Sequence, residues 1–218
     1  MTTEARPLRR DAQRNRERII EAAREVFAGR GFAATLDDVA HHAGVGVGTV
    51  YRRFPTKEAL VEAVFTDRLE DLVTLAEEAL AAPSAWDGLT DFLRRSARMH
   101  ATDRGLRDAA LSMDETHFAR AGEQIVPLLE QLMARAHEEG SLRPDAGFRD
   151  FPIIMAMVTE LAQNSAGCRS GLYERYLELM IDGLRARPGN GELGDGPSEA
   201  DVQAVMRECV PPLESRRR

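Results

Sequence analysis

Residues 35–57, reading TLDDVAHHAGVGVGTVYRRFPTK, predict two short helices joined by a glycine turn. Thr35 stands where a helix needs an N-cap, and Asp38, three residues later, completes a capping box. Gly44 follows the first helix at the point where the chain must bend sharply, which glycine does without steric cost. The second helix carries small, polar and cationic residues and few acids. This composition is typical of a helix that enters a groove of DNA and meets phosphates.

The same stretch and the helix before it carry a recognisable signature. Its residues are Thr35, Ala43-Gly44-Val45, Gly48-Thr49-Val50-Tyr51, Phe54 and Thr56-Lys57-Glu58-Ala59-Leu60, preceded by Arg18-Ile19-Ile20-Glu21-Ala22-Ala23, Val26-Phe27 and Gly31-Phe32. Together they resemble the DNA-binding signature of the TetR/AcrR family of bacterial transcriptional regulators over residues 15–70. The rest of the chain resembles the family only in its helical pattern and its length.

The distribution of charge agrees with this resemblance. The whole chain has a net charge of −7, which by itself argues against nucleic-acid binding. Residues 1–57, however, hold 11 Lys and Arg against 7 Asp and Glu, whereas residues 58–218 hold 18 against 29. A basic N-terminal part joined to an acidic remainder would be turned toward DNA by the field of the phosphates.

Apolar residues recur at helical spacing along the chain, and no β-alternation of useful length is present, so the sequence predicts an all-α fold. The expected helices span residues 11–30, 35–43, 47–54, 56–80, 86–100, 105–112, 124–139, 148–166 and 172–186. Ser198 and Asp201 form another capping box, which predicts a short further helix that ends near Cys209.

Three parts of the chain are expected from this pattern. Residues 1–57 would form an N-terminal arm and a three-helix DNA-binding domain with the helix-turn-helix, the first ten residues being disordered. Residues 58–187 would form a larger helical domain for ligand binding and dimerisation. Residues 188–218 would be a tail that opens with a flexible linker rich in glycine and proline, PGNGELGDGP at 188–197.

By the resemblance, residues 47–54 form the recognition helix, which lies in the major groove. The residues expected to contact DNA are Thr35, Gly46, Val47, Gly48, Thr49, Tyr51, Arg52, Arg53 and Lys57. Gly48 would let the backbone approach the DNA closely, while Val47 and Thr49 would touch a thymine methyl group or a base edge. Tyr51, Arg52 and Lys57 would reach phosphates. Arg9, Arg10, Arg14 and Arg16 form a basic arm suited to backbone or minor-groove contact.

Two positions depart from the usual family pattern. The residue that begins the recognition helix is often Ser and here is Gly46, and the next residue is often polar or charged and here is Val47. The surface that reads bases is therefore poor in hydrogen-bonding groups, and we expect specificity to lean on methyl contacts and DNA shape. The alternatives are a plain helical hairpin in a core and, for Arg53, a side chain that is only solvated.

The resemblance also implies a ligand cavity and a dimer interface in the larger domain. Apolar, methionine and polar side chains between residues 86 and 163 are candidates for the cavity lining: Trp86, Phe92, Met99, His100, Met113, His117, Phe118, Met155, Met157, Thr159 and Gln163. The alternative for each is ordinary core packing or, for the polar ones, an exposed surface. The family's interface is a four-helix bundle built from the last two main helices of each partner. Tyr173, Tyr176 and Met180 would lie there or in the core.

No constellation of catalytic residues stands out, so we do not expect an enzyme, and no cofactor is implied. Asp114-Glu115-Thr116-His117 lacks a second histidine at metal-binding spacing, so no metal site is expected. The chain has no run of about 18 apolar residues and no visible export signal, which indicates a cytoplasmic protein that does not enter a membrane.

The expected function is a ligand-responsive regulator, of the repressor kind by family resemblance. It would bind a palindromic operator in double-stranded DNA as a homodimer and be released by a small-molecule effector. The alternative is a dimeric DNA-binding regulator without a small-molecule effector, controlled by a protein partner or by its expression level. An enzyme with an accessory DNA-binding domain is a further alternative.

Overall fold

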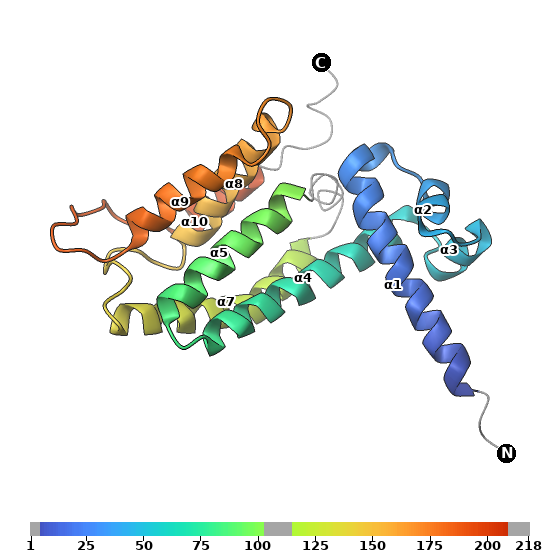
Figure 1. Ribbon diagram of the computed structural model, residues 1–218, viewed down its shortest axis with the longest axis horizontal. Coiled ribbons are helices and arrows are strands. Elements are labelled where there is room, and N and C mark those ends of the chain that lie inside the picture. Colours follow the sequence, from blue (N-terminus) through green and yellow to red (C-terminus); the bar gives the residue numbers. More distant parts are fainter. Residues whose placement is uncertain (1–4, 103–114, 209–218) are drawn as a thin grey trace. The chain divides into compact units, whose positions relative to one another are not determined.

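The computed structural model describes residues 5–102 and 115–208, and within them the chain is built of helices joined by turns and loops (Figure 1). The helices are α1 (Ala5–Arg30), α2 (Leu36–Ala43), α3 (Val47–Arg53), α4 (Lys57–Ala81), α5 (Ala85–Thr102), α7 (Glu115–Glu138), α8 (Asp150–Ser165), α9 (Leu172–Leu184) and α10 (Glu199–Glu208). A single 3₁₀ turn, Gly31–Ala33, follows α1. The predicted all-α fold is confirmed.

Two helices begin earlier than their sequence pattern predicts. Helix α1 begins at Ala5 instead of residue 11, so the expectation of disorder over residues 1–10 is wrong for residues 5–10. Pro7 is compatible with this start, because the first turn of a helix has no acceptor for the N–H group that proline lacks. Helix α7 begins at Glu115, nine residues before the expected start, and holds Pro127 inside it. The helix expected over residues 105–112 lies outside the described residues.

The described residues divide into two compact units. The N-terminal unit comprises residues 5–69, and the C-terminal unit comprises residues 70–102 and 115–208. In the N-terminal unit, α1 packs on α2 and α2 packs on α3. Its largest fully buried side chains come from all four helices: Ile19, Phe27, Val39, Val50, Leu60, Val61 and Val64. The short helices α2 and α3 and the first part of α4 are thus packed with α1 around one shared core. None of them would be stable as an isolated helix.

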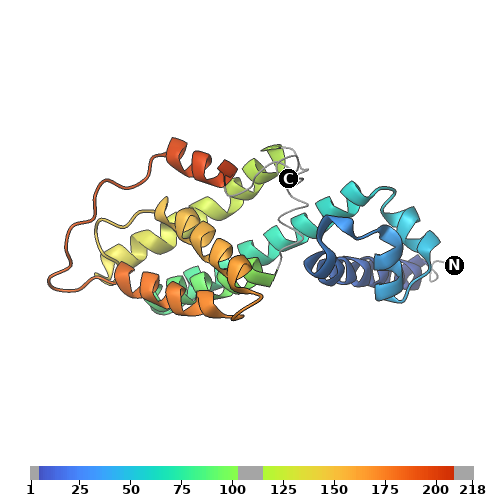
Figure 2. The same ribbon diagram turned by 90° about the horizontal axis from the view of Figure 1, so that it is seen from above.

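In the C-terminal unit, α5 contacts α7, α8 and α9, α9 packs on α8, and α10 lies against α8 (Figure 2). The rings of Phe92 on α5 and Phe151 on α8 are 5.3 Å apart between centroids. Gly88 lies where α5 passes close to the end of α4. A Cβ atom at this position would lie 2.2 Å from the carbonyl oxygen of Ala79. Only glycine fits this crossing, so the hairpin of α4 and α5 depends on it.

The segment after α9 is held in place by an ion pair between buried Arg143 and half-buried Asp145. The Arg143 guanidinium pairs with the Asp145 carboxylate, the Nη2–Oδ2 distance being 2.9 Å, and donates to the carbonyl oxygens of Gly183 and Gly191. Asp145 also accepts from the backbone N–H of Leu193 at 2.8 Å. The glycine-rich stretch expected as a linker is therefore fixed to the α7–α8 connection. The predicted helix after Ser198 is confirmed as α10, and its capping box with Asp201 is present.

This attachment should loosen in acid. The Arg143 guanidinium and the Leu193 N–H hold the pKa of Asp145 at about 2, below its ordinary value of 3.8. Because the pKa is lowered in the folded chain, the attachment is complete above pH 4 and is lost as the pH falls toward 2. Following the Leu193 amide by NMR should show a titration in this range. Asp145→Asn should abolish it and Asp195→Asn, an exposed acid of the same segment, should leave it unchanged; a titration that survives Asp145→Asn would contradict the assignment.

Candidate nucleic-acid interface

The capping box predicted at the start of α2 is present. Thr35 Oγ1 accepts a hydrogen bond from the Asp38 backbone N–H at 3.1 Å, and the Asp38 carboxylate accepts from the Thr35 N–H at 2.9 Å. Arg30 at the end of α1 adds an ion pair to Asp38, with 2.5 Å between Nη1 and Oδ1. The Thr35 hydrogen bonds, with help from Arg30, lower the pKa of Asp38. The direction in which α2 leaves α1 is therefore fixed at its first turn.

The turn between α2 and α3 is fixed by Gly44 and Arg18. Gly44 has φ 64°, in the left-handed region that favours glycine, and its N–H bonds back to the end of α2. Arg18 on α1 donates from Nη2 to the carbonyl oxygen of Ala43 at 2.7 Å. The carbonyl group of Ala43, which has no acceptor role within the ladder of α2, thus accepts from a charged side chain of α1. This contact orients the turn against the core.

Helix α3 is anchored by Val50 and presents its other side to solvent. Val50 is completely buried and Phe54, which follows the helix, is 5% exposed. Val47 and Tyr51 are 43% and 46% exposed, although large apolar side chains are usually covered. Among the remaining predicted contact residues of this helix, Gly46, Gly48, Arg52 and Arg53 are exposed and Thr49 is half-buried. The structure therefore brings the predicted residues 46–53 together on one exposed helix.

The polar side chains of α3 are engaged within the chain. Arg52 Nη2 donates to Thr49 Oγ1 at 3.3 Å. The Asp37 carboxylate on α2 raises the pKa of the Tyr51 hydroxyl, which is a hydrogen-bond donor at neutral pH. These contacts hold the outward side chains close to the helix before any DNA is bound.

Gly48 has no packing reason to be glycine. A Cβ atom at this position would meet nothing within 4 Å, and the residue has no positive φ. Glycine in a helix is less favourable than alanine by roughly 0.5 to 1 kcal/mol. The fold does not require this glycine. Its lack of a side chain leaves open space on the outer surface of α3.

Lys57 is the first residue of α4 and lies beside the core of the N-terminal unit. Its Nζ atom is 5.9 Å from the centroid of the Phe27 ring, and partial burial lowers the pKa of its amine. The preceding Thr56 caps α4, since its Oγ1 accepts from the Ala59 N–H at 3.1 Å. The lysine is thus held at a helix start, where backbone N–H groups also point outward.

The roles of two residues of this surface were missed by sequence reasoning. Arg18 was quoted as part of the signature and Asp37 lies in the helix predicted over residues 35–43, but neither was given a role. In the structure Arg18 closes the α2–α3 turn and Asp37 lies beside Tyr51. The only local signal for Asp37 was its place in the first turn of α2. Arg18 had no local signal, because its partner Ala43 lies 25 residues further along the chain.

The predicted cavity residues that the structure describes occupy different environments. Trp86, Phe92 and Met155 belong to the core of the C-terminal unit, Thr159 and Gln163 are half-buried on α8, and His100 is exposed. Met113 lies outside the described residues, as do the side chains of His117 and Phe118 on α7. The lining of the cavity therefore remains a prediction.

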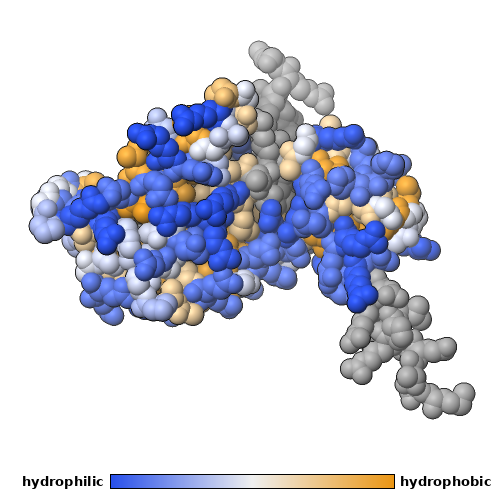
Figure 3. Space-filling model, in the orientation of Figure 1, coloured by the Kyte–Doolittle hydropathy of each residue, from blue (hydrophilic) through white to orange (hydrophobic). Residues whose placement is uncertain are grey.

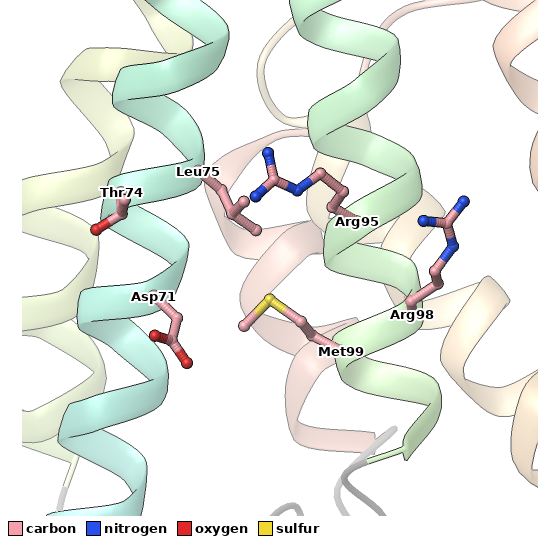
Figure 4. Close-up of a pocket in the computed structure, with 6 residues that line it drawn as sticks. All are labelled: Asp71, Thr74, Leu75, Arg95, Arg98 and Met99. Atoms are coloured by element: carbon pink, nitrogen blue, oxygen red, sulfur yellow. The ribbon is translucent and has the colours of Figure 1, made fainter.

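A groove of about 380 Å³ opens between α4 and α5 (Figure 4). It is lined by Asp71, Thr74, Leu75, Arg95, Arg98 and Met99, of which sequence reasoning selected Met99 alone. Arg95 pairs with Glu78 on α4 at 2.5 Å and with Asp91 on α5 at 3.4 Å. Sequence reasoning did not select Arg95 and Arg98, because charged residues on a helix are usually solvated. Trp86 lines a different groove of about 610 Å³ along α9, where Arg185 stacks on its ring.

Metal and membrane binding receive no support from the described part of the chain. Among residues 5–102 and 115–208, no group of three or more His, Cys, Asp or Glu side chains is arranged to hold a metal ion. The described helices also lack the combination of length and apolar character that a bilayer crossing requires.

Comparison with known proteins follows the same division of the chain. A family model described as bacterial regulatory proteins of the tetR family matches residues 19–64, and one described as the C-terminal domain of SbtR-like transcriptional regulators matches residues 84–186. The HTH-type transcriptional regulator SrpR of Pseudomonas putida is 26% identical over 198 residues, which cover 87% of this chain and 84% of that protein.

Solved structures of regulators agree. The TetR transcriptional regulator SCO0520 from Streptomyces coelicolor is 30% identical, with a TM-score of 0.63, over 79% of this chain and 99% of that one. A TetR transcription regulatory protein from Mycobacterium vanbaalenii is 38% identical, with a TM-score of 0.62, over 82% of this chain and 99% of that one. The resemblance noted over residues 15–70 is confirmed and extends over the helical remainder. The chain belongs to the TetR family of bacterial transcriptional regulators.

Proposed function

We propose that this regulator is a ligand-responsive repressor that binds a palindromic operator as a homodimer. The observation that carries the proposal is the exposed side of α3. This helix buries Val50, whereas Val47 is exposed and Gly48 is not required by the packing of the fold. In this proposal residues 1–57 bind DNA, residues 58–187 carry the ligand and dimer surfaces, and residues 188–218 form an additional C-terminal part. Thr35, Tyr51, Arg52, Arg53 and Lys57 would hold phosphates on either side of α3.

An apolar face on α8 and α9 supports dimerisation. Met157 on α8 and Tyr176 and Leu179 on α9 are 48%, 43% and 55% exposed, and half-buried Leu161, Leu172 and Met180 lie beside them in the helical repeat. Figure 3 shows hydrophobic surface among polar residues in the region of these helices. A second copy related by a two-fold axis would cover this face and present two recognition helices about 34–36 Å apart, one turn of DNA.

Helix α4 supports a coupling between ligand and DNA. It runs without interruption from Lys57, a proposed phosphate contact, to the turns that carry Asp71, Thr74 and Leu75 in the groove against α5. A ligand that binds this groove better when the recognition helices are wrongly spaced shifts the population away from the DNA-binding form. A difference of a few kcal/mol between the two forms is enough to release the operator.

The proposal can be tested in two steps with the full chain. Selection from random DNA should first enrich a palindrome with half-sites one turn apart, and anisotropy should then give its affinity. A small-molecule library should next yield a compound that releases this DNA. Filling the groove with Thr74→Trp should abolish release and keep DNA binding, whereas Glu77→Trp, an exposed position of α4 outside the groove lining, should change neither.

The outcomes separate the proposal from its rivals. Recovery of no specific DNA would overturn operator binding. A specific site that no compound releases would favour a dimeric regulator governed by a protein partner or by its own concentration. Release that survives Thr74→Trp would place the effector elsewhere in the C-terminal unit.

A further inference from the structure

We infer that α3 reads thymine through its 5-methyl group and that Val47 is the side chain that reads it. The inference rests on the operator binding proposed above and names what that operator must contain. It concerns the start of α3, where the N-cap residue Gly46 is followed by Val47 and Gly48, the first two residues of the helix.

The first turn of a recognition helix is the part that meets the base edges. In this chain the side chains of residues 46–48 can neither donate nor accept a hydrogen bond, since two of these residues are glycine and the third is valine. Direct readout in the major groove therefore has one kind of contact left at these three positions, an apolar one. Val47 has the only side chain among them, and 43% of Val47 is exposed.

The polar residues that follow do not take over this task. Thr49 is half-buried and its Oγ1 already accepts from Arg52. Tyr51 lies one turn further along the helix, beside the Asp37 carboxylate of α2. These side chains are directed to neighbours within the chain, and their remaining hydrogen-bonding capacity suits phosphate oxygens.

Only one base carries an apolar group in the major groove. Guanine, cytosine and adenine present donors and acceptors there, while thymine adds its 5-methyl group. The two glycines that flank Val47 leave room for this methyl group and for the base edge, since a Cβ at Gly48 would meet nothing of the protein within 4 Å. The valine methyl groups and the thymine methyl group would thus exclude water from each other. Each half-site must then hold a thymine opposite Val47.

The test replaces single thymines by deoxyuridine, which removes only the methyl group. In the operator recovered by selection, one position in each half-site should weaken binding about fourfold on this change, the effect of burying one methyl group, and both changes together about 15-fold. 5-Methylcytosine compared with cytosine at the same position should show the gain that belongs to the methyl group and not to thymine as a whole.

A variant ties the effect to Val47. Val47→Ala should bind the thymine and deoxyuridine operators with nearly equal affinity, and its circular dichroism should match that of the unchanged protein because the side chain is exposed. Val50→Ala offers no such control, since Val50 is in the core. The deoxyuridine series on the unchanged protein stands independently of any variant.

Different outcomes contradict thymine readout by Val47 and operator binding itself. A selected operator that tolerates deoxyuridine at every position overturns the inference and leaves operator binding intact. A thymine preference that Val47→Ala retains in full also overturns it. Recovery of no specific operator overturns the proposed function, and the inference falls with it.

Discussion

Gly48→Leu is expected to abolish operator binding while leaving the N-terminal unit folded. A side chain at this position meets nothing in the protein, and leucine favours the helix more than glycine does, so the melting temperature should be equal or higher. On DNA the same side chain would occupy the space where the backbone approaches the bases. A misfit of about 1–3 kcal/mol in each of two recognition helices corresponds to a loss of affinity of about 30-fold at the least and more than 10,000-fold at the most.

Anisotropy with the selected operator and thermal unfolding measure the two halves of this expectation. Gly29→Leu is the matched control, because Gly29 lies on α1 and a Cβ there also meets nothing within 4 Å. It should bind DNA as the unchanged protein does. If Gly48→Leu also bound normally, the backbone of α3 would not approach the DNA at Gly48, and the proposed contact surface would have to move.

Leu179→Arg is expected to convert the regulator into a folded monomer with weak DNA binding. Leu179 is 55% exposed in the single chain, so an arginine there costs the protomer little, but at the proposed two-fold interface it would place charges beside an apolar face. Without the partner, one recognition helix must bind alone, and the operator affinity should fall by about 100-fold to 1,000-fold.

Sedimentation at several concentrations distinguishes monomer from dimer, and anisotropy measures the affinity. Leu193→Arg is the matched control, since Leu193 is half exposed and lies outside α8 and α9. It should stay dimeric and bind DNA normally. A Leu179→Arg protein that remains dimeric would show that the copies meet through another surface.

The features that could be predicted from the sequence are those whose partners lie a few residues apart. Thr35 with Asp38 and Ser198 with Asp201 are three residues apart, and both capping boxes are present. The left-handed turn at Gly44 follows from local sterics in the same way. The exposure of Gly46, Val47, Gly48 and residues 51–53 accompanies the burial of Val50, the apolar anchor of α3. Interactions between residues close in sequence determine these features, so the sequence pattern was sufficient to predict them.

Features that depend on distant partners had no local signal. Arg143 reaches Gly183 and Gly191, 40 and 48 residues further along the chain, and nothing near Gly191 indicates that it is held. The cavity lining was uncertain for another reason. Apolar periodicity marks Trp86, Phe92 and Met155 as buried, but it does not tell whether neighbouring side chains fill the space beside them or leave it empty. The groove between α4 and α5 is lined instead by charged side chains, which periodicity assigns to the surface.

Lys57 has a practical consequence, because it is the only lysine in the chain. An amine-selective acylating reagent would therefore modify a single side chain, at the start of α4. Partial burial lowers the pKa of this amine, which raises the fraction of the reactive neutral form at a given pH. In the proposed complex, bound operator would shield it. The acylation of the peptide that contains Lys57, measured apart from that of the α-amino group of the chain, would then report DNA occupancy at one residue. One acetyl group placed there would likewise remove all the lysine charge that the protein has.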